Sequence, residues 1–172
     1  VDNVDLTIQK GEITAIIGPN DAGKTTFFNL ISGYHQPTSG EIYFKNEKIT
    51  KTPAYKIAAL GIARTFQTTH LFEQSTVLDN VLTGYRLRTK ANLFDAIFRT
   101  PREKREEKAA YEKAVEVMEF VGITSLAHLP VSAITEEAKK RTACALALAT
   151  EPEIIFLDEL AAGTNPDETE RL

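Results

Sequence analysis

The chain has 172 residues, of which 42% are hydrophobic and 26% are charged. This length and composition fit one globular domain or two small ones, with a core that needs no disulfide or metal. Twenty basic and 24 acidic residues give a net charge of −4, so an overall basic footprint is absent and we expect no nucleic-acid partner. No run of about 18 apolar residues occurs, which excludes a membrane-spanning helix. A single cysteine, Cys144, suits a reducing cytoplasm.

Short apolar runs alternate with turn signals in the first part of the chain. Residues 4–8 alternate apolar and polar side chains, which predicts a half-buried strand. The β-branched apolar run over 13–17 predicts a buried parallel strand. The patterns that follow predict a helix over 24–32 ended by Gly33, an edge strand over 40–44, a short helix over 53–60 ended by Gly61, and a strand over 62–66.

Helical patterns dominate the second part of the chain. They predict helices over 77–85, from the capping box at 100–103 to Gly122, and over 136–149. A second buried strand is predicted over 154–157, and a last helix opens at Pro166. We therefore expect an α/β core made of residues 1–69 and 146–172, into which a mostly helical domain of residues 70–145 is inserted.

Residues 18–25 read GPNDAGKT and match the phosphate-binding pattern G-x-x-x-x-G-K-[ST] at every fixed position. The pattern lies between an expected strand and an expected helix, where backbone N–H groups of the loop and of the helix N-terminus face phosphate oxygens. Lys24 would neutralise the β and γ phosphates, and the Thr25 hydroxyl would bind Mg²⁺. The expected nucleotide-binding residues are Gly18, Pro19, Asn20, Asp21, Ala22, Gly23, Lys24, Thr25 and Thr26.

An acidic pair follows the apolar run over 154–157. Asp158 would hold Mg²⁺ through water, and Glu159, which projects differently, would polarise an attacking water. Alone, the pair also fits a solvated strand end. Together with the phosphate loop it indicates a protein that binds a nucleoside triphosphate.

Further motifs occur in order along the chain: GIARTFQ at 61–67, LF at 71–72, TVLDNVL at 76–82 and LDELAAGTNP at 157–166. With the loop at 18–26 they resemble the ATP-binding subunit of an ABC transporter, of the branched-chain amino acid importer type, over almost the whole chain. The resemblance implies a P-loop NTPase (RecA-like) core with an antiparallel β edge and a helical ABC subdomain. It also implies ATP and Mg²⁺ as ligands, a second ATP-binding subunit and permease subunits as partners, and a cytoplasmic position on the inner face of the membrane.

The resemblance implies roles for single residues. Gln67 stands where the family has a glutamine that contacts Mg²⁺ or the attacking water, and Glu159 stands at the general base. Glu159 and Gln67 are therefore the expected catalytic residues, and the expected metal ligands are Thr25, Gln67 and Asp158. Asn165 falls in the loop that crosses between two such subunits.

Three residue changes depart from the family pattern. Asp21 replaces a usual glycine. Aspartate tolerates positive φ, but its carboxylate would lie near the ATP phosphates, and two unit charges about 5 Å apart at an effective dielectric of 20 repel by about 3 kcal/mol.

Glu137, in ITEEA at 134–138, stands where the family has the signature glycine that binds the γ-phosphate of the opposite subunit. Local chemistry gives another interpretation, in which Thr135 is an N-cap followed by two acids in the first helical turn. Leu160 replaces the proline that usually follows the catalytic glutamate.

The resemblance also places two functional residues outside the sequence. The aromatic residue that stacks on adenine is expected before Val1, and the switch histidine after Leu172, so we expect a core that is incomplete at both ends. Two alternatives to an active ATPase subunit therefore stay open. One is a catalytically weak nucleotide-binding or interaction module, and the other is a truncated remnant of such a subunit.

Overall fold

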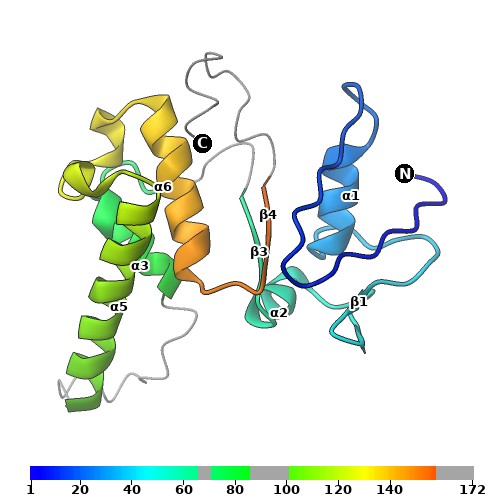
Figure 1. The fold of residues 1–172 in the computed structure, drawn as a ribbon, viewed down its shortest axis with the longest axis horizontal. Helices are drawn as coiled ribbons and strands as arrows, with labels where there is room; N and C mark the ends of the chain where they lie inside the picture. The colour runs from blue at the N-terminus through cyan, green and yellow to red at the C-terminus, as the bar shows by residue number, and fades with distance from the viewer. Residues whose placement is uncertain (66–70, 86–100, 158–172) are drawn as a thin grey trace. The chain divides into compact units, whose positions relative to one another are not determined.

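The computed structural model describes residues 1–65, 71–85 and 101–157 (Figure 1). The chain divides into two units, Val1–Leu60 and Gly61–Leu172. Each unit has its own secondary structure.

The first unit contains two short helices and one antiparallel strand pair. Its elements are α1 (Lys24–Ile31), β1 (Tyr43–Phe44), β2 (Glu47–Lys48) and α2 (Ala54–Ala59). β1 and β2 pair in antiparallel register, with Tyr43 opposite Lys48. Both predicted helices are confirmed to within about two residues, and the predicted edge strand over 40–44 is reduced to its last two positions.

The two strands predicted near the N-terminus are wrong. Residues 4–8 and 13–17 belong to no strand, and the side chains of Ile13 and Ile17 are 99% and 92% exposed. A β-branched run favours extended backbone, but a strand exists only where a neighbouring strand completes its hydrogen bonds. Within Val1–Leu60 the described strands, β1 and β2, pair with each other, so neither of them is hydrogen-bonded to residues 13–17.

The second unit combines a parallel strand pair with three packed helices (Figure 1). Its elements are β3 (Ile62–Arg64), α3 (Val77–Tyr85), α5 (Pro101–Phe120), the 3₁₀ turns η1 (Thr124–Leu126) and η2 (Val131–Ala133), α6 (Glu136–Ala149) and β4 (Ile154–Phe156). β3 and β4 are parallel, with Ile62 opposite Ile154 and Arg64 opposite Phe156. The predicted helices over 77–85 and 136–149 are confirmed, and so are the strands at 62 and 154.

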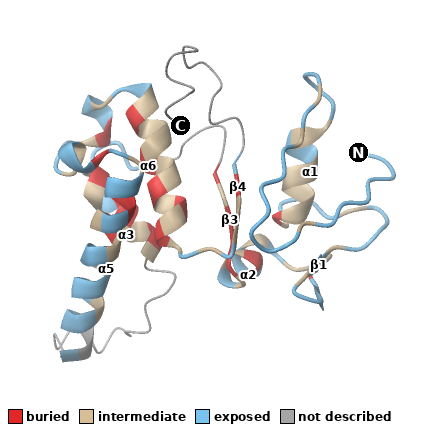
Figure 2. Cartoon of the chain, viewed as in Figure 1, coloured by how far each residue is buried: buried red, intermediate tan, exposed pale blue. Residues whose placement is uncertain are grey.

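The core of the second unit lies where α3, α5 and α6 face one another, as the buried positions in Figure 2 show. Apolar side chains at helical spacing on each helix point into this seam, and Ile123, just before η1, and Val131, the first residue of η2, close it. The buried members are Val77, Val81, Ala114, Val117, Met118, Ile123, Val131, Ala145 and Ala149. Of the helices in the described ranges, none is both long and apolar enough to cross a bilayer.

Gly84 brings the backbones of α3 and α6 into direct contact. A Cβ atom at Gly84 would lie 2.3 Å from the carbonyl oxygen of Leu146 and 3.2 Å from Cβ of Ala149. Because the nearer atom belongs to a helix backbone, it has little freedom to move away. Only glycine therefore permits this separation of the two helices.

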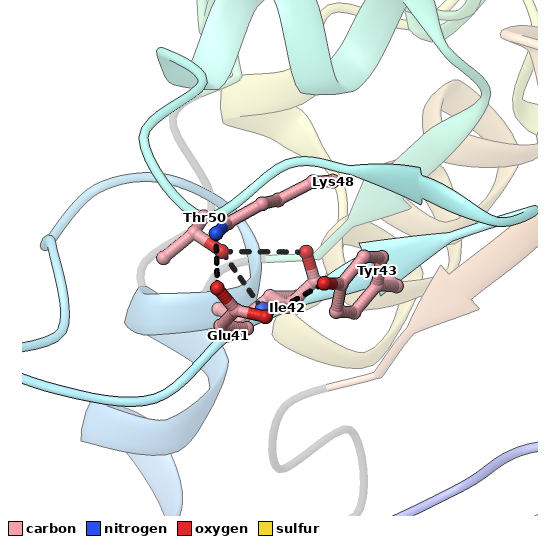
Figure 3. Close-up of polar contacts among 5 residues, drawn as sticks. All are labelled: Glu41, Ile42, Tyr43, Lys48 and Thr50. Atoms are coloured by element: carbon pink, nitrogen blue, oxygen red, sulfur yellow. Dashed lines mark hydrogen bonds and ion pairs between the residues drawn. The ribbon is translucent and has the colours of Figure 1, made fainter.

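A polar cluster on the hairpin of the first unit ties β1 to β2 (Figure 3). The Lys48 ammonium donates to the Glu41 carboxylate, and the Tyr43 hydroxyl donates to the same carboxylate (2.6 Å). Beside them, the N–H of Ile42 donates to Oγ1 of Thr50 (2.9 Å). The Lys48 hydrogen bond, followed by that of Tyr43, lowers the pKa of Glu41 below its ordinary value.

Replacing Gly84 with alanine should destabilise the second unit. The added methyl group gains helix propensity of about 1 kcal/mol, but a contact of 2.3 Å with a helix backbone puts the overpacking cost at about 3 kcal/mol, so we expect a net loss of about 2 kcal/mol. Urea denaturation measures the loss. Glu112→Ala, at an exposed position of α5, is the control and should stay within about 0.5 kcal/mol of wild type. Equal stability of Gly84→Ala and wild type would contradict the close approach.

The Glu41 carboxyl should titrate below its ordinary range, and Lys48→Met should raise its pKa toward the ordinary value. The folded-state pKa is lowered, so the stabilisation from these bonds is present above the ordinary pKa of glutamate and is lost as the pH falls through the lowered value. An NMR titration of the side-chain carboxyl carbon measures this pKa. Lys51→Met, an exposed lysine of the same unit, is the control and should leave it unchanged. A Glu41 pKa that does not respond to Lys48→Met would contradict the contact.

Candidate functional site

In the candidate phosphate loop, residues 18–26, residues 18–23 form a tight turn in front of α1 and residues 24–26 are the first turn of that helix. The N–H of Ala22 donates to the carbonyl oxygen of Pro19 (3.3 Å). Asp21 and Gly23 have φ angles of 65° and 88°, both in the left-handed region. The expectation that aspartate tolerates the turn at position 21 is therefore confirmed, and the Asp21 side chain is exposed beside the loop.

The N-terminus of α1 is open to an anion. Gly23 is its N-cap and supplies no side-chain hydrogen bond, and the first turn holds no acidic residue. The first intrahelical bond runs from the N–H of Phe27 to the carbonyl oxygen of Gly23 (2.8 Å). The preceding N–H groups, from Lys24 to Thr26, lie where a helix has no internal acceptor for them. They carry the partial positive charge of the helix dipole, which fits phosphate oxygens.

The Lys24 ammonium lies over the loop. It donates to the carbonyl oxygens of Gly18 and Pro19, each at 2.8 Å. An ammonium group has three donors, so two of them hold the loop and one remains for an incoming oxygen. The hydroxyl side chains of Thr25 and Thr26 are exposed at the same helix end. The residues present therefore fit a bound polyphosphate.

The remaining predicted site residues, Gln67, Asp158 and Glu159, lie outside the described residues, as do Leu160 and Asn165. What the structure describes is the pair of strands that lead to them. β3 and β4 are parallel, and beyond their last pair the N–H of Thr65 donates to the carbonyl oxygen of Phe156 (3.0 Å). The chain therefore leaves both strands at the same edge of the sheet, the carboxyl edge, where α/β proteins place their ligands.

The N-terminus of α6 has the opposite character to that of α1. Thr135 caps it, and its Oγ1 accepts the N–H of Ala138 (3.2 Å). The first turn holds two acids, Glu136 and Glu137. The interpretation of Thr135 as an N-cap followed by acidic residues is thus confirmed. A helix end capped and negatively charged by its own residues repels a phosphate.

Arg141 is a partner of Glu137 that sequence reasoning missed. Its guanidinium forms an ion pair with Glu137 one turn away and donates from Nη1 to the carbonyl oxygen of Val121 (3.2 Å). Glu137 is therefore held on α6 and connected to the end of α5. The spacing of glutamate and arginine by four residues was the available signal.

Smaller features of the described residues add no further site. In the described part of the chain, no group of histidine, cysteine and acidic residues has the arrangement of a metal site. Cys144 is partly buried in α6, and burial raises the pKa of its thiol. A thiol with a raised pKa is a poor nucleophile, which agrees with a packing role for this residue.

Comparison with known protein families matches residues 1–162 to the ABC transporter family. The chain belongs to this family. The candidate phosphate loop, α1 and the β3–β4 pair all lie within the matched residues.

Similar proteins of named function cover the whole chain. The chain is 38% identical over 172 residues to the high-affinity branched-chain amino acid transport ATP-binding protein LivG of Escherichia coli K12, and spans 68% of that protein. It has the same identity to BraF of Pseudomonas aeruginosa, which has the corresponding name. It is 34% identical to a probable LivG of Archaeoglobus fulgidus, of which it spans 63%.

Solved structures with the same fold are ATP-binding cassettes. The ADP conformation of the cassette MJ1267 superposes with a TM-score of 0.79 at 32% identity; the alignment covers 98% of this chain and 65% of that one. The chain thus spans slightly less than two thirds of that structure. A dimeric post-hydrolysis state of the cassette MJ0796, bound to ADP and Pi, has the same TM-score at 25% identity. The expected P-loop NTPase fold class is confirmed.

Proposed function

We propose that this chain is the ATP-binding subunit of an ABC importer and that it couples ATP binding and hydrolysis to the transport of branched-chain amino acids. The observation that carries the proposal is the loop 18–26, where Lys24 lies over the loop carbonyls in front of an uncapped helix. The solute class is supported by the names of LivG and BraF, to which the chain is similar along its whole length.

The proposed chemistry divides between the loop and the carboxyl edge of the β3–β4 sheet. The loop, with Lys24, binds the phosphates of ATP. Glu159 accepts a proton from water as the water oxygen attacks the γ-phosphorus, and the bond from that phosphorus to the ADP oxygen breaks. Thr25, Gln67 and Asp158 hold Mg²⁺, which when bound neutralises phosphate charge. The parallel exit of the chain from β3 and β4 supports a shared role for Gln67 and Asp158.

The same proposal includes the organisation and partners of the chain. Residues 1–69 and 146–172 form the NTPase core, and residues 70–145 form the helical subdomain. The β3–β4 pair supports this division, because it joins the chain before residue 70 to the chain after residue 145. The partners are a second ATP-binding subunit, as in the dimeric MJ0796 structure, and permease subunits, which hold the protein at the cytoplasmic face of the membrane.

A second candidate is a nucleotide-binding module with weak turnover. The N-terminus of α6 favours it, because Glu137, which pairs with Arg141 one turn further along the helix, stands in the stretch 134–138 that corresponds to the family signature. In the family resemblance, this helix end contacts the γ-phosphate held by the other subunit. A carboxylate at this helix end weakens its contact with the γ-phosphate bound by the other subunit. The hydrogen-bond donors of the chain's own phosphate loop are unaffected.

A titration with Mg·ATP tests nucleotide binding by the loop. We expect Lys24→Ala to weaken binding about 100-fold, because a charge-assisted contact to phosphate is lost, and Asp21→Gly to strengthen it about tenfold or more by removing a like charge. Calorimetry measures both dissociation constants. Lys10→Ala, an exposed lysine of the same unit, is the control and should change nothing. If the folded wild type and Asp21→Gly both fail to bind Mg·ATP, the ATP-binding role is wrong.

Turnover in the assembled transporter separates the two candidates. If Glu137 and Asp21 limit hydrolysis, the double variant Asp21→Gly with Glu137→Gly should raise kcat about tenfold or more, since relief of about 1.4 kcal/mol of the repulsion already gives a tenfold rate. Glu136→Gly is the matched control, because it makes the same change one residue earlier without touching Arg141. An unchanged kcat in the double variant would count against the weak-module candidate.

A further inference from the structure

Asn80 is a fully buried polar residue in the middle of α3, with an exposed fraction of 0%. Its Oδ1 accepts the N–H of Phe72 (2.8 Å), and its Nδ2 donates to the carbonyl oxygens of Phe72 (3.1 Å) and Thr76 (2.9 Å). One side chain thus bonds both backbone groups of Phe72. A buried carboxamide costs free energy unless it is satisfied in this way, and an apolar residue would pack beside Val77 and Val81 at lower cost.

The turn that Asn80 holds, residues 71–76, is also joined to the segment 127–132. Thr76 and Pro130 form an isolated antiparallel bridge. The backbone bonds between the two segments and across the start of α3 are Val131 N–H to Ser75 O, Ser132 N–H to Glu73 O, Val77 N–H to Leu129 O and Leu78 N–H to Ala127 O, each at 3.0 Å. The two segments are therefore held along their length by main-chain bonds, which resist sliding.

The segment 127–132 continues without a linker into the N-terminus of α6. The 3₁₀ turn η2 begins at Val131, its last residue is Ala133, and Thr135 then caps α6. The N–H of Ala133 donates to the carbonyl oxygen of Pro130 (2.9 Å), and that of Ile134 to Val131 (3.4 Å). Hydrogen bonds thus connect Phe72, through Ser75 and Val131, to Ile134, which is bonded covalently to the cap residue Thr135.

We propose that Asn80 is a positioning residue that makes the turn 71–76 and the N-terminus of α6 move as one body. The turn follows Gln67 by a few residues, and α6 begins at the signature stretch, so Asn80 would couple two regions that the proposed function assigns to ATP turnover. The role in turnover rests on that proposed function, whereas the mechanical link does not. Phe72, whose side chain is 63% exposed, is carried on this body.

The variant Asn80→Leu tests the link, because leucine keeps the volume and removes all three hydrogen bonds. The matched control is Thr142→Val: Thr142 is equally buried, but its hydroxyl donates only to Ala138 of its own helix (2.7 Å). We expect the N–H groups of Phe72, Val131 and Ser132, and that of Ala138 beyond them, to exchange with deuterium at least about tenfold faster in Asn80→Leu. The control should leave those of Phe72, Val131 and Ser132 unchanged. Faster exchange at Phe72 alone would show that Asn80 stabilises only the backbone of Phe72, and this result would overturn the proposal.

A measurement on the wild type keeps the test decisive if Asn80→Leu does not fold. Exchange of the same four N–H groups at increasing low urea concentrations reports how each one opens. If they belong to one body, their opening free energies converge to a common value before global unfolding. Separate values for Phe72 and for Ala138 throughout would overturn the link without any variant.

Steady-state kinetics in the assembled transporter test the role in turnover. For Asn80→Leu we expect kcat to fall about tenfold with the dissociation constant for Mg·ATP within about twofold of wild type, because the phosphate loop is untouched. A lost affinity with an unchanged kcat would overturn the role. Lys24→Ala, assayed in parallel, loses affinity if the proposed function holds. A wild type that does not bind ATP would refute the proposed function, and the exchange experiments would still decide the link.

Discussion

The close contact between α3 and α6 at Gly84 is the constraint on which the second unit depends. With the carbonyl of Leu146 directly beneath the glycine, the two helices share one apolar seam with α5. The seam is narrow enough that alanines on α6 suffice to fill it. Asn80 lies on α3 one turn before Gly84. Its buried carboxamide forms hydrogen bonds with the backbone of Phe72 instead of with water. A larger residue at position 84 would separate the helices and disturb both the apolar seam and the hydrogen bonds of Asn80.

The two helix N-termini to which the proposed function assigns a role have opposite local chemistry. At α1 the cap residue is a glycine, the first turn holds no acid, and the Lys24 ammonium adds positive charge. At α6 a threonine caps the helix and two glutamates complete its dipole. Since a helix end can be satisfied either by its own side chains or by a ligand, α1 is suited to a phosphate and α6 is not. Of the departures from the family pattern, Glu137 therefore stands at the helix end that would serve the opposite subunit, whereas Asp21 stands in the chain's own loop.

Local sequence signals predicted the helices well and some of the strands poorly. Val77, Val81 and Gly84 recur at the spacing of one helix face, which predicts α3 from its own residues. Thr135 is an N-cap residue, which predicts the start of α6. Neither prediction needed information about a distant part of the chain. The predicted strand over 13–17 rested on side-chain type alone, and it is wrong because no described strand of its unit pairs with it. β3 and β4 were predicted correctly as strands, but their parallel pairing joins segments far apart in the chain, which periodicity does not encode.

The sequence by itself determined the chemistry of this protein: the loop at 18–26, its lysine and its hydroxyls follow from residue types at fixed spacing, because backbone N–H groups and one ammonium are what a phosphate requires. The predicted roles of Gln67, Asp158 and Glu159 still rest on sequence, since these residues lie outside the described ranges. Only the tertiary structure decided how a buried amide at position 80 is satisfied, which two carbonyl oxygens Lys24 contacts, and that Glu137 is paired with Arg141. Those are contacts between atoms, and their existence depends on distances that folding sets.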